Sequence, residues 1–254
     1  MARNVPDGPP PPPVVQRVRL RYAKRGRLRF TSHRDFARAF ERALRRAGVP
    51  MAYSAGFTPH PKVSYVDAAP TGAASEAEYV EIGLAETVDV TALREALDAA
   101  LPDGLDIVEA VPAGPGGLAE RMTGSAWRLE LPGIGADEAR AAVDRFLGEP
   151  AVTVERLTKS GRRTVDVRAA VVRIQVVGAA PDAPDDDHAI IDVVVRQVTP
   201  AVRPDDVVAA LQSVAGLAPA APPRAVRLAQ GPLDEQGVIG DPLVADRASA
   251  ATEP

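Results

Sequence analysis

The chain has no cysteine among its 254 residues, which excludes disulfide bonds, thiolate zinc sites, cysteine nucleophiles and iron–sulfur clusters. It has no run of about 18 consecutive apolar residues, and its N-terminus lacks the residue order of a signal peptide. Walker loops, dinucleotide-binding glycine fingerprints and metalloprotease helices are absent as well. We therefore expect a soluble, cytoplasmic protein without a cofactor, a metal ion or membrane contact.

Lysine is scarce too, since Lys24, Lys62 and Lys159 are the only three, and arginine carries almost all of the positive charge. The net charge of -4 hides a strong asymmetry: residues 17–62 hold 13 lysines and arginines against two carboxylates, a local balance of +11. A basic segment on an acidic protein is typical of nucleic-acid binding. Because arginine is preferred throughout the chain, the preference alone says little about bidentate phosphate recognition.

The two ends of the chain are predicted to be disordered tails. Residues 1–14 contain five consecutive prolines, which favour an extended polyproline-type conformation. Residues 231–254 are rich in alanine and proline and lack periodic apolar faces. The intervening sequence is long and hydrophobic enough for two cores, which we place in domains at 15–115 and 124–230.

The first domain begins with a strand in which Val18, Leu20 and Tyr22 alternate with arginines, the period of a strand with one buried face. Ser32 with Asp35 three residues later predicts a helix start, and Gly48 predicts its end. The predicted elements are strands at about 15–23, 63–66, 78–84 and 105–111 and helices starting near Ser32 and Asp89. This order, β-α-β-β-α-β, is ferredoxin-like.

The second half repeats this order loosely, so we predict an α+β fold of two tandem ferredoxin-like (βαββαβ) domains. An extra strand arises from a hairpin of 152–157 with 164–177, with a bulge expected near Val171. A basic cluster lies around this hairpin, and either contact with nucleic acid or protection of an edge strand explains it. The cluster consists of Arg156, Lys159, Arg162, Arg163, Arg168 and Arg173.

The candidate site lies in the first 80 residues, where eight of the ten aromatic residues occur between Tyr22 and Tyr79. Aromatic rings stack on bases while cations and helix N-termini hold phosphates. Pro59 and Pro61 fix the backbone on both sides of His60. The predicted RNA- or phosphate-binding residues are Arg27, Arg29, Ser32, His33, Arg34, Arg38, Tyr53, Phe57, His60 and Lys62.

His33 and His60 are also the candidate catalytic residues, because the ferredoxin-like order would bring both to one site. Two imidazoles can exchange protons with a ribose hydroxyl and a leaving oxygen, which predicts metal-independent RNA cleavage. A metal site completed by Asp35 matches no diagnostic ligand spacing. Structural roles are the alternative, His60 in a hydrogen-bonded turn and His33 on the surface of a capped helix. The sequence favours binding without catalysis.

Four stretches carry a family resemblance: RFTSHRD at 29–35, RALRRAGVP at 42–50, YSAGFTPHPK at 53–62 and SEAEY at 75–79. They resemble the bacterial radical S-adenosylmethionine-linked protein family, a domain of unknown function that is often fused behind a cobalamin-binding radical enzyme or encoded as a separate chain. The resemblance is close over residues 16–115. Without cysteine this chain is not the radical enzyme itself, so the resemblance implies an accessory role.

The motifs are more distantly similar to those of CRISPR repeat-processing endoribonucleases, which have tandem ferredoxin-like domains and a histidine near the first helix. Those enzymes carry a glycine-rich loop near the C-terminus, and Gln230-Gly231-Pro232 does not match it. The leading hypothesis is an accessory protein that binds RNA, without DNA specificity, and presents it to a separate radical S-adenosylmethionine enzyme. The alternatives are the endoribonuclease and a protein-binding adaptor without RNA contact.

Overall fold

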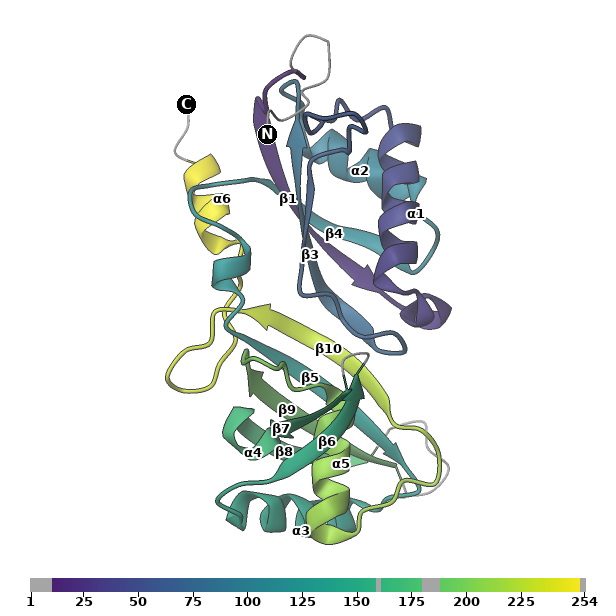
Figure 1. Ribbon diagram of the computed structural model, residues 1–254, viewed down its shortest axis with the longest axis vertical. Coiled ribbons are helices and arrows are strands. Elements are labelled where there is room, and N and C mark those ends of the chain that lie inside the picture. Colours follow the sequence, from purple (N-terminus) through teal and green to yellow (C-terminus); the bar gives the residue numbers. More distant parts are fainter. Residues whose placement is uncertain (1–10, 159–160, 180–187, 252–254) are drawn as a thin grey trace. The chain divides into compact units, whose positions relative to one another are not determined.

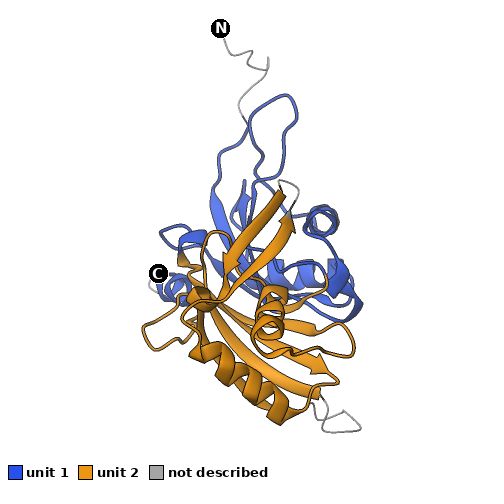
Figure 2. Cartoon of the chain, turned by 60° about the horizontal axis from the view of Figure 1, so that its bottom comes forward, with its two compact units in different colours: residues 1–71, 76–120, 243–254 blue, residues 72–75, 121–242 orange. Residues whose placement is uncertain are grey.

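The computed structural model describes residues 11–158, 161–179 and 188–251 and shows an α+β fold with a mixed sheet and, in these residues, six α-helices (Figure 1). The chain divides into two compact units (Figure 2). Unit 1 comprises residues 1–71, 76–120 and 243–254, and unit 2 comprises residues 72–75 and 121–242. No helix in the described ranges is long and apolar enough to cross a membrane.

Unit 1 has the predicted order β-α-β-β-α-β, to which the C-terminal segment adds a further helix. Its strands lie in the order β4-β1-β3-β2, and the β4–β1 and β2–β3 pairs are antiparallel. The elements are β1 (Gln16–Lys24), the 3-10 helix η1 (Gly26–Phe30), α1 (His33–Arg46), β2 (Val63–Val66), β3 (Ala74–Leu84), α2 (Val90–Ala100), β4 (Leu105–Pro112), η2 (Ala119–Arg121, which ends in unit 2) and α6 (Val244–Ala250).

The core of unit 1 lies between one face of its sheet and the helices α1 and α2. Alternate strand residues such as Val18 and Leu20 of β1 and Val80 and Ile82 of β3 are fully buried there. Phe40 of α1, also fully buried, packs into the same cluster. Burial of each such side chain contributes about 1.5–3 kcal/mol. The predicted apolar faces of the first strand and first helix are therefore the faces that form the core.

The C-terminal segment corrects the prediction of a disordered tail from residue 231. Residues 244–250 form α6, and Leu243 and Asp246 have no exposed surface. Asp246 accepts hydrogen bonds from the Arg19 side chain and from the Gly114 backbone N–H. The helix is too short for an apolar stripe to be visible in the sequence, and one of its anchors is a carboxylate. Residues 252–254 lie outside the described residues.

Most of the predicted N-terminal tail, residues 1–10, also lies outside the described residues. The segment that follows runs into the sheet of unit 1, since the Val15 N–H donates to the Leu84 carbonyl oxygen at 2.8 Å. Strand β1 then begins at Gln16.

Unit 2 has the strand order β10-β5-β9-β8, with antiparallel pairing throughout. Residues 74 and 75 of β3 belong to this unit and pair in parallel with residues 226 and 227 of β10. The elements are β5 (Gly124–Pro132), α3 (Ala136–Gly148), β6 (Thr153–Thr158), β7 (Gly161–Asp166), α4 (Val167–Ala170), β8 (Val171–Ala179), β9 (His188–Arg196), α5 (Pro204–Ala215) and β10 (Arg224–Gly231).

The strand predicted over residues 164–177 is interrupted in the structure. Strand β7 pairs with β6 in a separate two-stranded sheet and ends at Asp166, whose side chain accepts from the Ala169 N–H and caps α4. Val167 and Ala170 of this single helical turn are buried. The change of phase in the sequence reflects this helical turn and, as predicted near Val171, a bulge: the register of β8 against β9 shifts between Val171 and Arg173.

Candidate nucleic-acid interface

Helix α1 begins at the first of the two predicted motifs. The Ser32 hydroxyl oxygen accepts a hydrogen bond from the Asp35 N–H at 3.2 Å and donates one to the Asp35 carboxylate at 2.7 Å. The capping prediction is therefore confirmed. The negative charge of Asp35 offsets the partial positive charge of the helix N-terminus. The side chains that carry positive charge lie further along α1.

Four arginines line the exposed face of α1, which we call the α1 arginine stripe: Arg34, Arg38, Arg42 and Arg45. Within the described residues, none of them forms an ion pair with a carboxylate. Like charges three or four residues apart on a helix repel by about 0.2–0.5 kcal/mol per pair. The stripe thus holds four positive charges over about 16 Å of helix, none of them in an ion pair among the described residues.

The arginines of β1 have a different environment. Arg17 pairs with Glu81 at 3.0 Å. Arg19 is 2% exposed and pairs with Glu81 at 2.9 Å and with Asp246 at 2.6 Å, while it also donates to the Gly116 carbonyl oxygen. Burial lowers the pKa of Arg19, but the hydrogen bonds and charges of the two carboxylates outweigh it, so the pKa is raised. These arginines are part of the structure of unit 1.

Arg25 repeats this pattern just after β1. It donates to Glu76 and pairs with Asp106 at 2.7 Å, and the hydrogen bond with Glu76 is the main cause that raises its pKa. Arg21 lies 3.9 Å from Glu109. The positive charge counted for residues 17–62 is therefore largely neutralised on β1 and remains exposed mainly on η1 and α1.

The short helix η1 carries two of the predicted arginines. Arg27 is exposed, and the guanidinium of Arg29 lies 4.6 Å from the centre of the Phe30 ring. Phe30 is itself 59% exposed. This pair places a cation and an aromatic face together shortly before α1, an arrangement that suits a nucleic-acid base.

His33, the first residue of α1, lies against β2. Its ring is 4.9 Å from the Tyr65 ring at 90°, and Tyr65 also contacts Phe36 and Phe40 edge-on. These ring contacts leave the Tyr65 side chain only partly exposed. Burial, and secondarily the charge of Glu41, raises the pKa of Tyr65.

The second motif forms a closed loop between residues 54 and 60. The Ser54 N–H donates to the His60 carbonyl oxygen at 2.9 Å, and the His60 N–H donates to the Ser54 hydroxyl at 3.0 Å. Phe57 is 71% exposed and Tyr53 is 38% exposed. The loop therefore presents an aromatic side chain to solvent on a backbone that hydrogen bonds hold in place.

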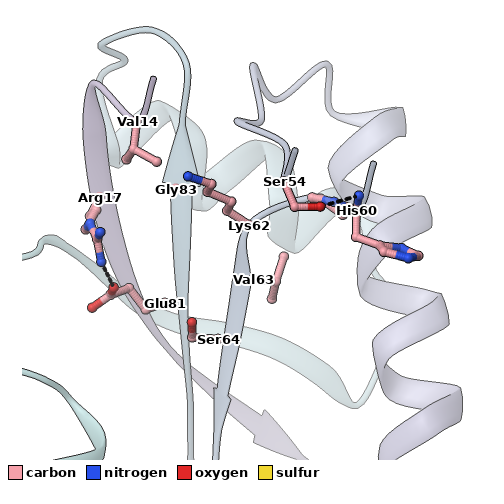
Figure 3. A pocket seen from close by; sticks show the side chains of 10 residues that line it. Val14, Arg17, Ser54, His60, Lys62, Val63, Ser64, Glu81 and Gly83 are labelled. Carbon is pink, nitrogen blue, oxygen red and sulfur yellow. Dashed lines mark hydrogen bonds and ion pairs between the residues drawn. The ribbon is translucent and has the colours of Figure 1, made fainter. Parts of the chain in front are cut away.

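His33 and His60 line two different pockets. His33 lines a small hollow that also includes Lys24 and Glu78, both buried. His60 lines a different pocket, and in Figure 3 its imidazole points away from Lys62 and toward α1. That His33 and His60 face one site stays a prediction. Within the described ranges, no three histidine or carboxylate side chains are grouped to hold a metal ion.

Lys62, predicted together with the α1 arginines, lies elsewhere. It lines a pocket of about 260 Å³ with Arg17, Ser54 and Ser64 on the sheet of unit 1 (Figure 3). We call this the Lys62 pocket. Sequence reasoning missed Ser54, Ser64 and Arg17, although Arg17 stands in the alternating pattern on the strand face opposite the core.

The basic cluster of unit 2 is partly neutralised. Arg156 pairs with Asp206 at 2.7 Å, and Arg162 pairs with Glu155 at 3.1 Å. Arg168 lies over the Phe146 ring at 5.9 Å. Arg163 and Arg173 are exposed, and Lys159 lies outside the described residues. Two arginines of this cluster thus pair with carboxylates, as the arginines of β1 do.

The fold and this basic helix face define an α+β protein with an arginine-lined surface. A family model described as "Uncharacterized protein conserved in bacteria (DUF2344)" matches residues 17–204. The chain belongs to this family. No curated protein matches it.

Among solved structures, the chain is similar to one described as "Crystal Structure of an Unknown Protein from Galdieria sulphuraria". The identity is 14%, the match covers 78% of this chain and 91% of that chain, and the TM-score is 0.24. A likeness at this TM-score supports no argument about function.

Proposed function

We propose that this protein binds RNA through the α1 arginine stripe. The observation that carries the proposal is that the stripe is exposed and, among the described residues, has no carboxylate partner. A phosphate backbone supplies the missing counter-charges and releases its own counterions, so binding is favourable and depends on salt. It also removes the repulsion between the arginines of α1.

The exposed aromatic rings extend the surface for single-stranded RNA. Phe57 on the closed loop and Phe30 beside Arg29 each offer a ring face to solvent. Stacking of a base on such a ring is worth about 1–3 kcal/mol and tolerates any base. The proposed ligand is therefore an unpaired RNA segment whose phosphates follow the stripe.

The test measures binding of a fluorescent 16-nucleotide RNA by anisotropy at several salt concentrations. The double variant Arg34→Gln with Arg38→Gln is expected to weaken binding at least tenfold. It is also expected to reduce the slope of log affinity against log salt by about 1.4, because each lost phosphate contact on a single strand contributes about 0.7.

The matched control is Arg140→Gln with Arg145→Gln, two exposed arginines of helix α3 in unit 2. This variant removes the same charge from the same kind of element and should bind RNA as the wild type does. Equal weakening in both double variants, or binding without salt dependence, would refute the proposal.

We further propose that the bound RNA is presented to a separate radical S-adenosylmethionine enzyme. The support is the resemblance of the motifs at 29–35 and 53–62. Tagged protein purified from cells should retain such an enzyme after nuclease treatment if the two proteins touch directly, and release it if only RNA joins them. Absence of any such enzyme in the untreated eluate would argue against this role.

We also propose that each unit has a ferredoxin-like fold. It is supported by the strand orders β4-β1-β3-β2 and β10-β5-β9-β8, with the β6–β7 hairpin inserted in the second. The alternative, metal-independent RNA cleavage by His33 and His60, stays a prediction, and the two histidines line different pockets in the structure.

A further inference from the structure

The Lys62 pocket lies on unit 1, apart from the α1 arginine stripe. Arg17 on β1 and Lys62, just before β2, lie on the two sides of β3, with Glu81 of β3 between them (Figure 3). Ser54 and Ser64 add two hydroxyl groups to the lining. The pocket therefore combines two cations and two hydroxyl groups from three segments: β1, the loop that holds Ser54, and residues 62–64.

The one carboxylate in the pocket is already neutralised. One oxygen of Glu81 accepts from Arg17 at 3.0 Å and the other from Arg19 at 2.9 Å. Arg17 donates to Glu81 through one nitrogen and is otherwise 62% exposed. Lys62 forms no ion pair within the described part of the chain. The charge left over in the pocket is positive, which suits an anion.

Hydroxyl donors complete the polar lining. The Ser54 oxygen accepts from the His60 N–H, which leaves its hydroxyl hydrogen to donate elsewhere. Ser64 lies beside β3 in the same view (Figure 3). Hydroxyls and cations around one small volume are the donors that phosphate oxygens prefer.

Gly83 lines the pocket beside Lys62 and has no side chain to fill it. A Cβ atom at this position would lie 3.2 Å from Val14 and 3.3 Å from the Cβ of Lys62. A side chain here would push the Lys62 stem or the Val14 side chain aside. The missing side chain thus keeps the entrance beside Lys62 open.

The pocket adjoins a larger cavity of about 500 Å³, with which it shares Arg17, Ser64 and Glu81. The far wall of this cavity is the glycine-rich segment 114–119, in which Leu118 is buried. The combined space exceeds what an inorganic phosphate needs. A phosphate held at Lys62 would leave room for an organic group along this segment.

We propose that the Lys62 pocket binds a phosphomonoester, with the phosphate between Arg17 and Lys62 and the organic group directed toward residues 114–119. This site does not depend on RNA binding by the α1 arginine stripe. The phosphomonoester is either a free metabolite or the terminal phosphate of an RNA, and the chemistry recognised is the same.

The test follows backbone amide signals of the full chain by NMR while inorganic phosphate or adenosine 5′-monophosphate is added. Saturable shifts are expected at Ser64 and Gly83, with a dissociation constant of about 1 mM or lower for the nucleotide. Lys62→Ala should weaken binding at least about tenfold, and Ser64→Ala about fivefold. Gly83→Ala should weaken it as well, by narrowing the entrance.

The charge-matched control is Arg45→Ala, which removes one positive charge from the α1 arginine stripe and should leave phosphate binding unchanged. The double variant Arg34→Gln with Arg38→Gln should also keep it, so loss of RNA binding and loss of phosphate binding are separable. Signals that do not saturate below about 10 mM, or equal losses in Lys62→Ala and Arg45→Ala, would overturn the proposal.

Binding of two RNA oligonucleotides that differ only in a 5′-phosphate shows whether the phosphomonoester is an RNA end or a free metabolite. If the phosphate strengthens binding and Lys62→Ala removes this gain, the ligand is an RNA end. If the nucleotide binds and the 5′-phosphate adds nothing, the ligand is a free phosphomonoester. Failure of the nucleotide, inorganic phosphate and the 5′-phosphate alike would exclude the site.

Discussion

The arginines of β1 and those of α1 belong to one basic stretch of sequence but have opposite environments. On β1, Arg17 and Arg19 meet Glu81 and Asp246, and the charges are neutralised within unit 1. On α1, the arginine stripe faces solvent and pairs with no carboxylate among the described residues. The sheet brings carboxylates from neighbouring strands beside each arginine, whereas the outer face of a surface helix has no neighbour.

This difference teaches that a count of charges along the sequence overestimates the basic surface. An arginine paired with a carboxylate contributes little to the field that an RNA meets. Arg19 of β1 is expected to affect stability, and the arginines of α1 are expected to affect RNA binding. Four substitutions sharpen or break this separation.

The largest effect is expected for Arg19→Met. It leaves the buried carboxylate of Asp246 without its main cation, and breaking a buried ion pair in this way costs about 3–5 kcal/mol. Urea denaturation should show this loss in the free energy of unfolding. Arg17→Gln is the control, because Arg17 is itself 62% exposed and its pair with Glu81 should contribute less than about 1 kcal/mol.

Truncation after Pro242 tests the same contact from the other partner, since it removes α6 and Asp246. A loss comparable to that of Arg19→Met is expected. If both variants are as stable as the wild type, the buried pair does not anchor α6 and the comparison with α1 fails.

Ser32→Ala is expected to cost about 1 kcal/mol, because it removes the side chain that caps α1. Fraying of the first turn would also disturb Arg34, the first member of the stripe. Circular dichroism and urea denaturation measure the loss, and Ser32→Asp should restore most of the stability. An alanine variant of wild-type stability would show that the cap does not hold the stripe.

Tyr65→Phe tests a buried polar group that, unlike the guanidinium of Arg19, forms no hydrogen bond among the described residues. The Tyr65 hydroxyl has no hydrogen-bond partner within the described residues, so its removal should leave stability unchanged or raise it by up to about 1 kcal/mol at pH 7. A lower stability of Tyr65→Phe at pH 7 would mean that the hydroxyl has a partner in solution.

The raised pKa of Tyr65 adds a dependence on pH. Above about pH 10, tyrosine in the unfolded chain ionises while folded Tyr65 stays neutral, so the unfolded state is favoured as the pH rises. Wild-type stability should therefore fall more steeply between pH 9.5 and 11 (about 1.4 kcal/mol per unit at most) than that of Tyr65→Phe. Parallel curves would contradict the shift.

The smallest effect is expected for Arg38→Gln. It removes like-charge repulsion with Arg34 and Arg42 and should raise stability by a few tenths of a kcal/mol while it weakens RNA binding. Thermal unfolding and RNA anisotropy on the same sample measure both. A loss of stability would mean that Arg38 has a structural partner, as the arginines of β1 do.

Much of the fold was predictable where local chemistry decides it. The Ser32 cap, the apolar stripe of α1 and the alternating residues of β1 all lie where the sequence pattern indicates. The ends of the elements followed from Gly48 and from the Asp89 cap. The exposed side chains of the α1 arginines were predictable from the same periodicity.

The misses share one physical cause, since each depends on contacts distant in sequence. Helix α6 is ordered because Asp246 meets Arg19, 227 residues away. Lys62 joins Arg17 rather than α1 because the chain before β2 lies on the sheet of unit 1.

The sequence by itself therefore determined the order β-α-β-β-α-β of unit 1, which faces are apolar and where the positive charges are attached. These depend on periodicity and on interactions within a few residues. Only the tertiary structure decided which arginines meet a carboxylate and which remain exposed, because the acidic partners of β1 come from β3, β4 and α6, and a linear sequence does not show which segments fold against one another.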